Sequence, residues 1–263
     1  MKRGLPLLLL IATLTMTGCG AAARAPHPSS SAPPPGLAGA GGAPTAPAAP
    51  ATSTPTASAA PPPPAVKGWS ASVAFRGGIV PGGKDLRPFM RWSWRRGCPV
   101  PPERLRLVRV DHWGFDRKVH RGELIVHRDH ARRILAVMER LFSARYPIER
   151  MRLVDAYRAD DDRSMAANNT SAFNCRRVKG TSRWSEHALG LAVDVNPLRN
   201  PYVTPGGRVS PPAGRRWANR ARAGAAMIRP GDKVVRAFRA AGWHWGGYWS
   251  GSRDYQHFSA RNR

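Results

Sequence analysis

The first 66 residues contain no Trp, Tyr or Phe and no Asp or Glu, which restricts where this chain can fold. After the apolar run at residues 5–16, this segment has few large apolar side chains, so it cannot bury enough surface to offset the entropy lost on ordering. The folded part must therefore lie in residues 67–263, which is long enough for one sizeable core and too short for two ordinary ones. We expect a single domain there.

The N-terminal 19 residues have the pattern of an export signal. A Lys-Arg pair precedes an apolar run at residues 5–16, about half of the ~20 residues that a membrane-spanning helix needs. The run ends near Cys19 in a sequence that resembles a bacterial lipobox, whose Cys is lipidated and becomes the mature N-terminus. Residues 1–19 are predicted to be a lipoprotein signal peptide, and the protein to be exported and anchored to a membrane. The alternative is secretory cleavage near Ala23, which would release it.

Residues 20–66 consist mainly of Pro and Ala, with Ser, Thr and Gly. This composition predicts a disordered tether. A Pro-rich chain extends roughly 3.1 Å per residue, so the tether could reach on the order of 140 Å from an anchor.

The chain carries 42 Lys and Arg against 16 Asp and Glu, a net charge of +26. This balance excludes a simple acidic cytosolic enzyme. Dense positive charge alone would suit a nucleic-acid binder, because cations release counterions from phosphate. However, most of the cations are Arg with no recognition helix or stacking motif, and the export signal argues against nucleic acid. Compositional bias or contact with anionic wall polymers explains the charge better.

Cys98 and Cys175 remain once Cys19 is set aside. In an oxidising compartment two thiols allow one disulfide, and no C-x-x-C pair indicates a thiolate metal site. We predict a Cys98–Cys175 disulfide; two unpaired buried cysteines are the alternative.

The folded part has the pattern of an α+β domain, with a small antiparallel sheet and flanking helices. Short β-branched runs predict strands, and apolar residues at helical spacing predict helices. Asp129 is expected to cap the first helix and Asp232 the second. The expected strands are 106–110, 123–126, 152–157 and 188–195, and the expected helices run from Asp129 to about Tyr146 and from Asp232 to Ala241.

Histidine and aspartate recur at short spacing in the last third of the chain. His187 and Asp194 bracket an apolar run, and a buried carboxylate there needs a cation or a metal as partner. Strand alternation would place them on opposite faces, so they converge only if His187 lies in the preceding turn or Gly190 forms a bulge. Asp254 and His257 are expected on one side of a helical turn. Two His and one Asp suit zinc, while the alternative is a set of satisfied polar residues in the core.

The S-x-H-x-x-G-x-A-x-D element that starts at Ser185 and the D-x-x-H element that starts at Asp254 together resemble a known family. This is the bacterial zinc D-alanyl-D-alanine carboxypeptidase family, which includes vancomycin-resistance carboxypeptidases and dipeptidases and phage L-alanyl-D-glutamate endopeptidases. The phage branch is the more similar, since it has an acidic residue three before the last zinc His. The resemblance includes residues 157–158 and 161–176, covers roughly 95–260, and implies a Hedgehog/DD-peptidase-like fold.

The resemblance implies a zinc cofactor and gives each matching residue a role. Asp254 matches the general base, and Arg158 matches the arginine that steadies the oxyanion or substrate carboxylate. Ser185 is expected either to help hold the substrate or to serve as a turn residue or helix cap. Many relatives have Glu at the Asp254 position, so the shorter side chain lies about one methylene further from its target. The matching zinc ligands are His187, Asp194 and His257.

These roles predict zinc-dependent hydrolysis of a peptide bond in the peptidoglycan stem, of the D,D-carboxypeptidase or the L-alanyl-D-glutamate endopeptidase type. The expected partners are stem peptides, a membrane through the lipid anchor, and anionic wall polymers. A non-catalytic peptidoglycan-binding module on the same fold is the alternative, but it would require a lost ligand or base, and none is lost.

Overall fold

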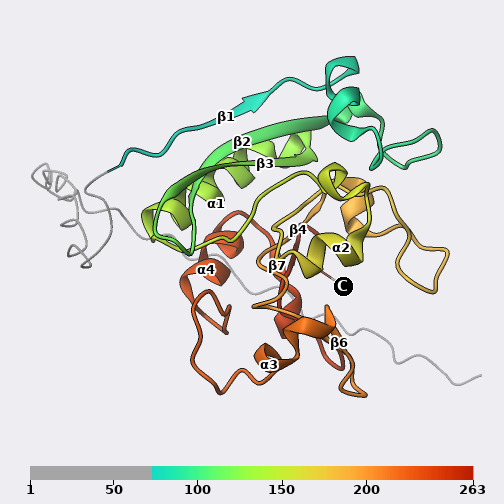
Figure 1. Cartoon of the computed structure of the whole chain (residues 1–263). Helices are drawn as coiled ribbons and strands as arrows, with labels where there is room; N and C mark the ends of the chain where they lie inside the picture. The colour runs from blue at the N-terminus through green and yellow to red at the C-terminus, as the bar shows by residue number, and fades with distance from the viewer. Residues whose placement is uncertain (1–72, 263) are drawn as a thin grey trace, which may run out of the picture. The chain divides into compact units, whose positions relative to one another are not determined.

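Residues 73–262 of the computed structural model combine three small antiparallel sheets with short α-helices (Figure 1). This confirms the expected α+β class. Within these residues, no helix is both long enough and apolar enough to cross a membrane. The predicted signal peptide 1–19 with Cys19 and the whole of the predicted tether, 20–66, lie outside the described residues, as do residues 67–72 at the start of the predicted domain.

The first sheet contains β1 (Gly77–Val80), β2 (Leu105–Trp113) and β3 (Val119–His127) in that order, all antiparallel. Both predicted strands in this region are confirmed, and each is longer than predicted. Their apolar side chains face α1 on one side and a second apolar cluster on the other, so both faces are partly buried.

The helix α1 (Ala131–Ser143) packs along β2 and also contacts α4 (Lys233–Ala240) (Figure 1). Asp232 caps α4 as predicted, because its carboxylate accepts hydrogen bonds from the backbone N–H groups of the first turn. The predicted cap of α1 is wrong. Asp129 lies inside a short 3-10 helix, and its N–H instead donates to His127 Nδ1 at 3.4 Å.

The second sheet has the order β4 (Ala192–Asp194), β9 (His257–Ser259), β7 (His244–Trp245). Of the predicted strand 188–195, only β4 forms. The chain before it is a 3-10 helix that Gly190 ends with a left-handed φ of 67°.

The third sheet has the order β6 (Val209–Ser210), β5 (Tyr202–Val203), β8 (Arg253–Asp254). The 3-10 helices are η1 (Lys84–Met90), η2 (Pro102–Arg104), η3 (Arg128–His130), η4 (Val154–Tyr157), η5 (Glu186–Leu189), η6 (Pro212–Gly214) and η7 (Gly246–Tyr248). Of the two short helices, α3 (Arg215–Ala218) contacts β6 of the third sheet and α2 (Asp161–Ala166) contacts η4.

The predicted strand at 152–157 is wrong, because this segment enters η4. The backbone of Arg152 pairs with a side chain and not with a neighbouring strand. Its N–H donates to Asn169 Oδ1 at 2.8 Å, and its carbonyl accepts from Asn169 Nδ2 at 2.9 Å. An amide side chain thus takes the place of a strand.

Cys98 and Cys175 form a disulfide, with their Cα atoms 5.9 Å apart, as predicted. The bond joins the segment after η1 to the loop that precedes Ser185, and it lies beside an apolar cluster that includes Leu86 and Phe173. This loop leads into η5, which carries His187.

Candidate metal centre

Three side chains that are far apart in sequence meet at the end of the second sheet. His187 comes from η5, Asp194 from β4 and His257 from β9, and each is at most 5% exposed. One potential ligand atom of each lies within 4.8 Å of the others. In residues 73–262 no other group of His, Cys, Asp or Glu meets this criterion for holding a metal ion. The predicted convergence is confirmed.

The local fold of η5 brings His187 to Asp194. The Ser185 hydroxyl accepts a hydrogen bond from the His187 N–H at 3.3 Å and caps the turn. Gly190 then reverses the chain, and its carbonyl accepts from His127 N–H at 2.8 Å. A Cβ at Gly190 would lie 2.6 Å from that nitrogen, so a side chain does not fit there. His187 therefore lies in the turn before the strand, which is one of the two arrangements that would allow convergence.

The tautomer of His187 is set by a backbone carbonyl. His187 Nδ1 lies 2.6 Å from the Ala172 oxygen, which can only accept, so Nδ1 carries a hydrogen and Nε2 is the nitrogen that offers a lone pair when the imidazole is neutral. Nε2 is directed at Asp194 Oδ2, 3.2 Å away. Ala172 is held in place because Ser171 and Asp194 exchange backbone hydrogen bonds. A carbonyl partner of this kind has no signal in the sequence, and sequence reasoning missed it.

The carboxylate of Asp194 and the imidazoles of His187 and His257 stabilise each other's charged forms. Burial would raise the pKa of Asp194, but the attraction and hydrogen bonds of His187 and His257 outweigh it and hold that pKa well below its usual range. Burial would lower the pKa of His187, yet the Asp194 carboxylate raises it. His257 Nδ1 lies 3.0 Å from Asp194 Oδ1. Two imidazole nitrogens and a carboxylate, buried and preoriented, could hold a metal ion, and this donor set is one that zinc accepts.

Asp254 reaches the neighbourhood by a route that was not predicted. It ends β8 and pairs with Tyr202 in the third sheet, whereas His257 begins β9 in the second, so the predicted helical turn between them is wrong. The linking residues bond to other segments, since the Gln256 carbonyl accepts from Val195 N–H at 3.0 Å. A Cβ at Gly246 would lie 2.9 Å from the Asp254 Cβ, so the glycine allows η7 to approach β8.

The Trp249 ring packs against the His257 ring, with centroids 5.4 Å apart. Trp249 is half-buried, unlike Trp243 and Trp245, which are in the core. The wall beside the candidate metal ligands therefore includes an indole.

Arg158 and Ser185 occupy different settings. Arg158 is exposed, has a left-handed φ of 57°, and its guanidinium forms no hydrogen bond or ion pair within the described residues. Ser185 is buried and caps η5. The structure thus gives Ser185 a capping contact next to His187 and leaves the Arg158 guanidinium at the surface.

Arg176 and Asp161 form an ion pair near His187 that sequence reasoning did not assign. Arg176 Nη2 lies 2.8 Å from Asp161 Oδ2, and both side chains are about two-thirds buried or more. Their charges act on the pKa of His187 in opposite senses, the arginine lowering it and the aspartate raising it. The residue after the disulfide therefore places a cation beside the candidate metal centre.

A family model described as D-alanyl-D-alanine carboxypeptidase matches residues 179–260. No curated protein and no solved structure matches the chain significantly. The resemblance drawn from the two sequence elements is confirmed over this segment, which contains Ser185, Asp254 and all three members of the buried group. The match begins after Arg158 and after the 161–176 segment, so it is narrower than the resemblance described above.

Proposed function

We propose that this protein is a zinc-dependent peptidase that hydrolyses a bond in the peptidoglycan stem peptide, as a D,D-carboxypeptidase or an L-alanyl-D-glutamate endopeptidase. The observation that carries the proposal is the buried group of His187, Asp194 and His257 inside the segment matched by the carboxypeptidase family.

His187 Nε2, a carboxylate oxygen of Asp194 and one nitrogen of His257 would hold the zinc ion. When bound, zinc polarises a carbonyl and lowers the pKa of water to about 7, which supplies a nucleophile at neutral pH. The Ala172 carbonyl supports this role by fixing the tautomer of His187 that leaves Nε2 free to bind.

Asp254 would act as the general base. Its carboxylate accepts the proton of the water that forms the new C–O bond, and it returns a proton to the amine that leaves as the C–N bond breaks. The half-buried position of Asp254 at the end of β8 supports this role, because partial exclusion of water strengthens its interaction with a substrate proton.

Arg158 and Ser185 would bind the substrate. The guanidinium of Arg158 is not engaged by the described residues, so its planar fork is available to a carboxylate or an oxyanion. The Ser185 hydroxyl accepts from His187 N–H and still has its own hydrogen to donate.

We also propose that the protein is exported and anchored through Cys19, with ordinary secretion as the alternative. The disulfide between Cys98 and Cys175 supports an oxidising compartment. Fractionation of cells that express Cys19→Ala tests the anchor: the variant should leave the membrane fraction, and membrane retention equal to wild type would contradict lipidation at Cys19.

Incubation of the full-length, zinc-loaded protein with defined stem peptides tests the activity. Products identified by mass distinguish release of terminal D-Ala from cleavage between L-Ala and D-Glu, and a chelator arm and His257→Ala serve as controls. Cleavage that is lost in both controls supports the proposal. Binding of stem peptides without any cleavage would contradict it and would favour the non-catalytic module.

A further inference from the structure

A second cluster of polar side chains surrounds Trp217, apart from the His187, Asp194 and His257 group. The Arg199 guanidinium lies 4.2 Å from the centre of the Trp217 ring, and the Arg216 guanidinium lies 4.5 Å from the same ring. Arg199 also lies over the Phe115 ring, at 5.0 Å. Two guanidinium groups thus contact the same indole ring.

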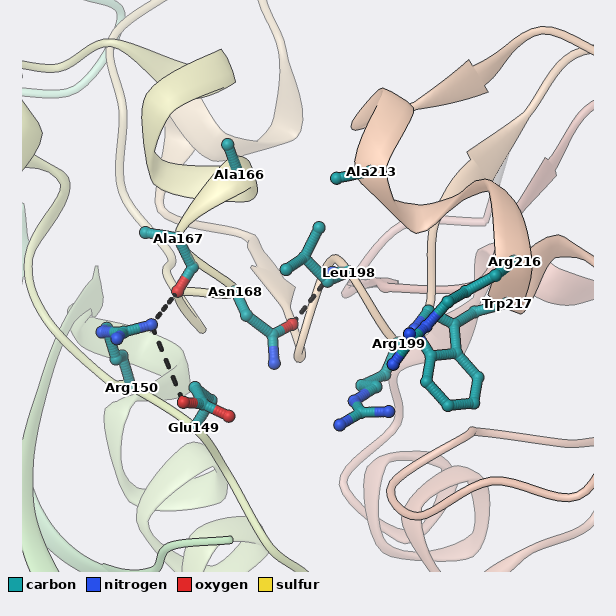
Figure 2. A pocket seen from close by; sticks show the side chains of 10 residues that line it. All are labelled: Glu149, Arg150, Ala166, Ala167, Asn168, Leu198, Arg199, Ala213, Arg216 and Trp217. Carbon is teal, nitrogen blue, oxygen red and sulfur yellow. Dashed lines mark hydrogen bonds and ion pairs between the residues drawn. The ribbon is translucent and has the colours of Figure 1, made fainter.

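These guanidinium groups line a cavity of about 260 Å³ (Figure 2). The cavity lies between the C-terminal end of α2 and the start of α3. Two of its lining residues are joined by a hydrogen bond, because Asn168 Oδ1 accepts from Leu198 N–H at 2.9 Å. In Figure 2, Arg199, Arg216 and Trp217 lie on one side and Arg150 with Glu149 on the other.

The positive charge of this cavity is not neutralised. Within residues 73–262, neither the Arg199 nor the Arg216 guanidinium forms an ion pair with a carboxylate or donates a hydrogen bond. Glu149 is the one carboxylate among the described lining residues, and it lies 3.8 Å from Arg150. Burial and the nearby charge of Arg216 lower the pKa of Arg199, and the opposite effect of Glu149 does not offset them. Two like charges held together at a cavity without a partner are the arrangement of an anion site.

We propose that Arg199, Arg216 and Trp217 form a binding site for a phosphodiester group of an anionic polymer. This inference does not depend on the proposed hydrolysis. The proposed binding site is separate from the metal centre.

The number and geometry of the donors favour phosphate. A carboxylate presents both oxygens in one plane and is matched by a single guanidinium fork. A phosphodiester group has four oxygens in a tetrahedral arrangement around phosphorus, and its two charged oxygens can each accept from a different fork. The cavity is slightly smaller than the roughly 300–1,000 Å³ of small-molecule sites. It therefore suits a phosphate with a small linker.

The same features disfavour nucleic acid. Non-specific binding of single strands needs aromatic faces on which bases stack. The Trp217 ring is already occupied by two guanidinium groups. A polymer without bases, such as poly(glycerol phosphate), fits the site better.

Binding of the full-length protein to labelled poly(glycerol phosphate), measured by fluorescence anisotropy in the presence of chelator, tests the proposal. Arg199→Gln and Arg216→Gln should each raise Kd by about 10-fold or more, the effect of losing a hydrogen bond to a charged group. Arg215→Gln is the matched control: it removes the same charge from the neighbouring exposed position of α3, which is not among the residues that line the cavity. It should change Kd by about twofold or less.

Two further variants separate recognition from general charge and from misfolding. Arg216→Lys keeps the charge but loses the planar fork, so it should also weaken binding. Arg216→Gln should melt within a few degrees of wild type, because it relieves repulsion on Arg199 but also removes the contact of Arg216 with the Trp217 ring.

Three results would overturn the proposal. The first is an equal loss of affinity in Arg215→Gln and Arg216→Gln, which would show general attraction. The second is wild-type affinity in Arg216→Lys. The third is binding of poly-L-glutamate or single-stranded DNA as tight as that of poly(glycerol phosphate). Because chelator is present and no cleavage is measured, failure here leaves the peptidase proposal untouched.

Discussion

Two aspartates in different sheets, Asp111 in β2 and Asp194 in β4, are both buried beside two nitrogen-bearing side chains, but these side chains are arginines at Asp111 and histidines at Asp194. Asp111 is 1% exposed and accepts hydrogen bonds from Arg76 Nε at 2.9 Å and Arg121 Nη1 at 3.0 Å. Asp194 is 5% exposed and lies between two imidazoles, at 3.2 and 3.0 Å. Each carboxylate thus has two nitrogen partners.

The difference lies in what the partners can do. Arginine stays protonated and has no lone pair, so the Asp111 group is a closed set of ion pairs that fastens the segment before β1 to the first sheet. Histidine can lose its proton and offer a nitrogen lone pair, so the Asp194 group can exchange protons for a cation. Burial of a carboxylate by itself indicates neither role.

Removal of one imidazole beside Asp194 is expected to have the largest effect, and the affected property is the zinc affinity. His257→Ala leaves two ligands, and its zinc affinity should fall by more than the ~10–100-fold that loss of an outer partner costs. Metal analysis of purified protein measures this. Arg121→Gln, which removes one partner of Asp111, is the matched control and should keep its zinc. Equal zinc content in His257→Ala and wild type would remove His257 from the ligand set.

Asp254→Asn separates two properties of the Asp194 region, the binding of zinc and the catalysis of peptide hydrolysis. The variant should keep zinc and its fold but lower kcat by roughly 10²–10⁴, the usual contribution of general acid-base catalysis. Steady-state kinetics on the stem peptide that the wild type cleaves provides the measurement, and Asp254→Glu, which keeps a carboxylate, should recover part of the rate. Full activity in Asp254→Asn would assign the base to another residue.

Local periodicity made part of the fold predictable. The strands β2 and β3 and the helices α1 and α4 are long enough to carry their own apolar pattern, and all four were predicted, although both strands are longer than predicted. The strands β5 to β8 have two residues each, which is too short to carry a periodic pattern, so only their pairing defines them. The failed strand at 152–157 shows the same limit, because its partner is the side chain of Asn169.

The candidate site was predictable to the extent that its residues lie in short motifs. His187, Asp194 and His257 were found from spacing and resemblance. The Ala172 carbonyl has no residue-type signal, and Arg176 and Asp161 become neighbours only through the fold. The arginines around Trp217 were equally hidden, because Arg199 and Arg216 come from separate segments and belong to no motif.

Asp111→Asn should affect stability and leave the metal centre intact. The substitution weakens two hydrogen bonds from charged donors, each worth about 1.5–3 kcal/mol when the partner is removed entirely. Because Arg76 and Arg121 are themselves 77% and 48% exposed and can return to water, we expect a loss of only about 1–2 kcal/mol. Denaturant unfolding of matched zinc-loaded samples measures it. A parallel loss of zinc would contradict the separation of the two aspartate groups.

The pH dependence of stability gives the smallest expected effect. Burial raises the pKa of Asp111, but the hydrogen bonds and charges of Arg76 and Arg121 outweigh it, so the pKa in the folded state lies below its ordinary value. A carboxyl group with a lowered folded pKa contributes stability above the unfolded value of about 3.9, and the contribution is lost as the pH falls through the folded pKa. The stability difference between wild type and Asp111→Asn should therefore be constant above about pH 5 and shrink below about pH 4. Urea unfolding of both proteins across this range, in apo form so that zinc release does not contribute, measures the difference. A difference that stays constant down to pH 2 would mean that the two arginines do not favour the charged form of Asp111, and the contrast with Asp194 would then rest on packing and not on charge.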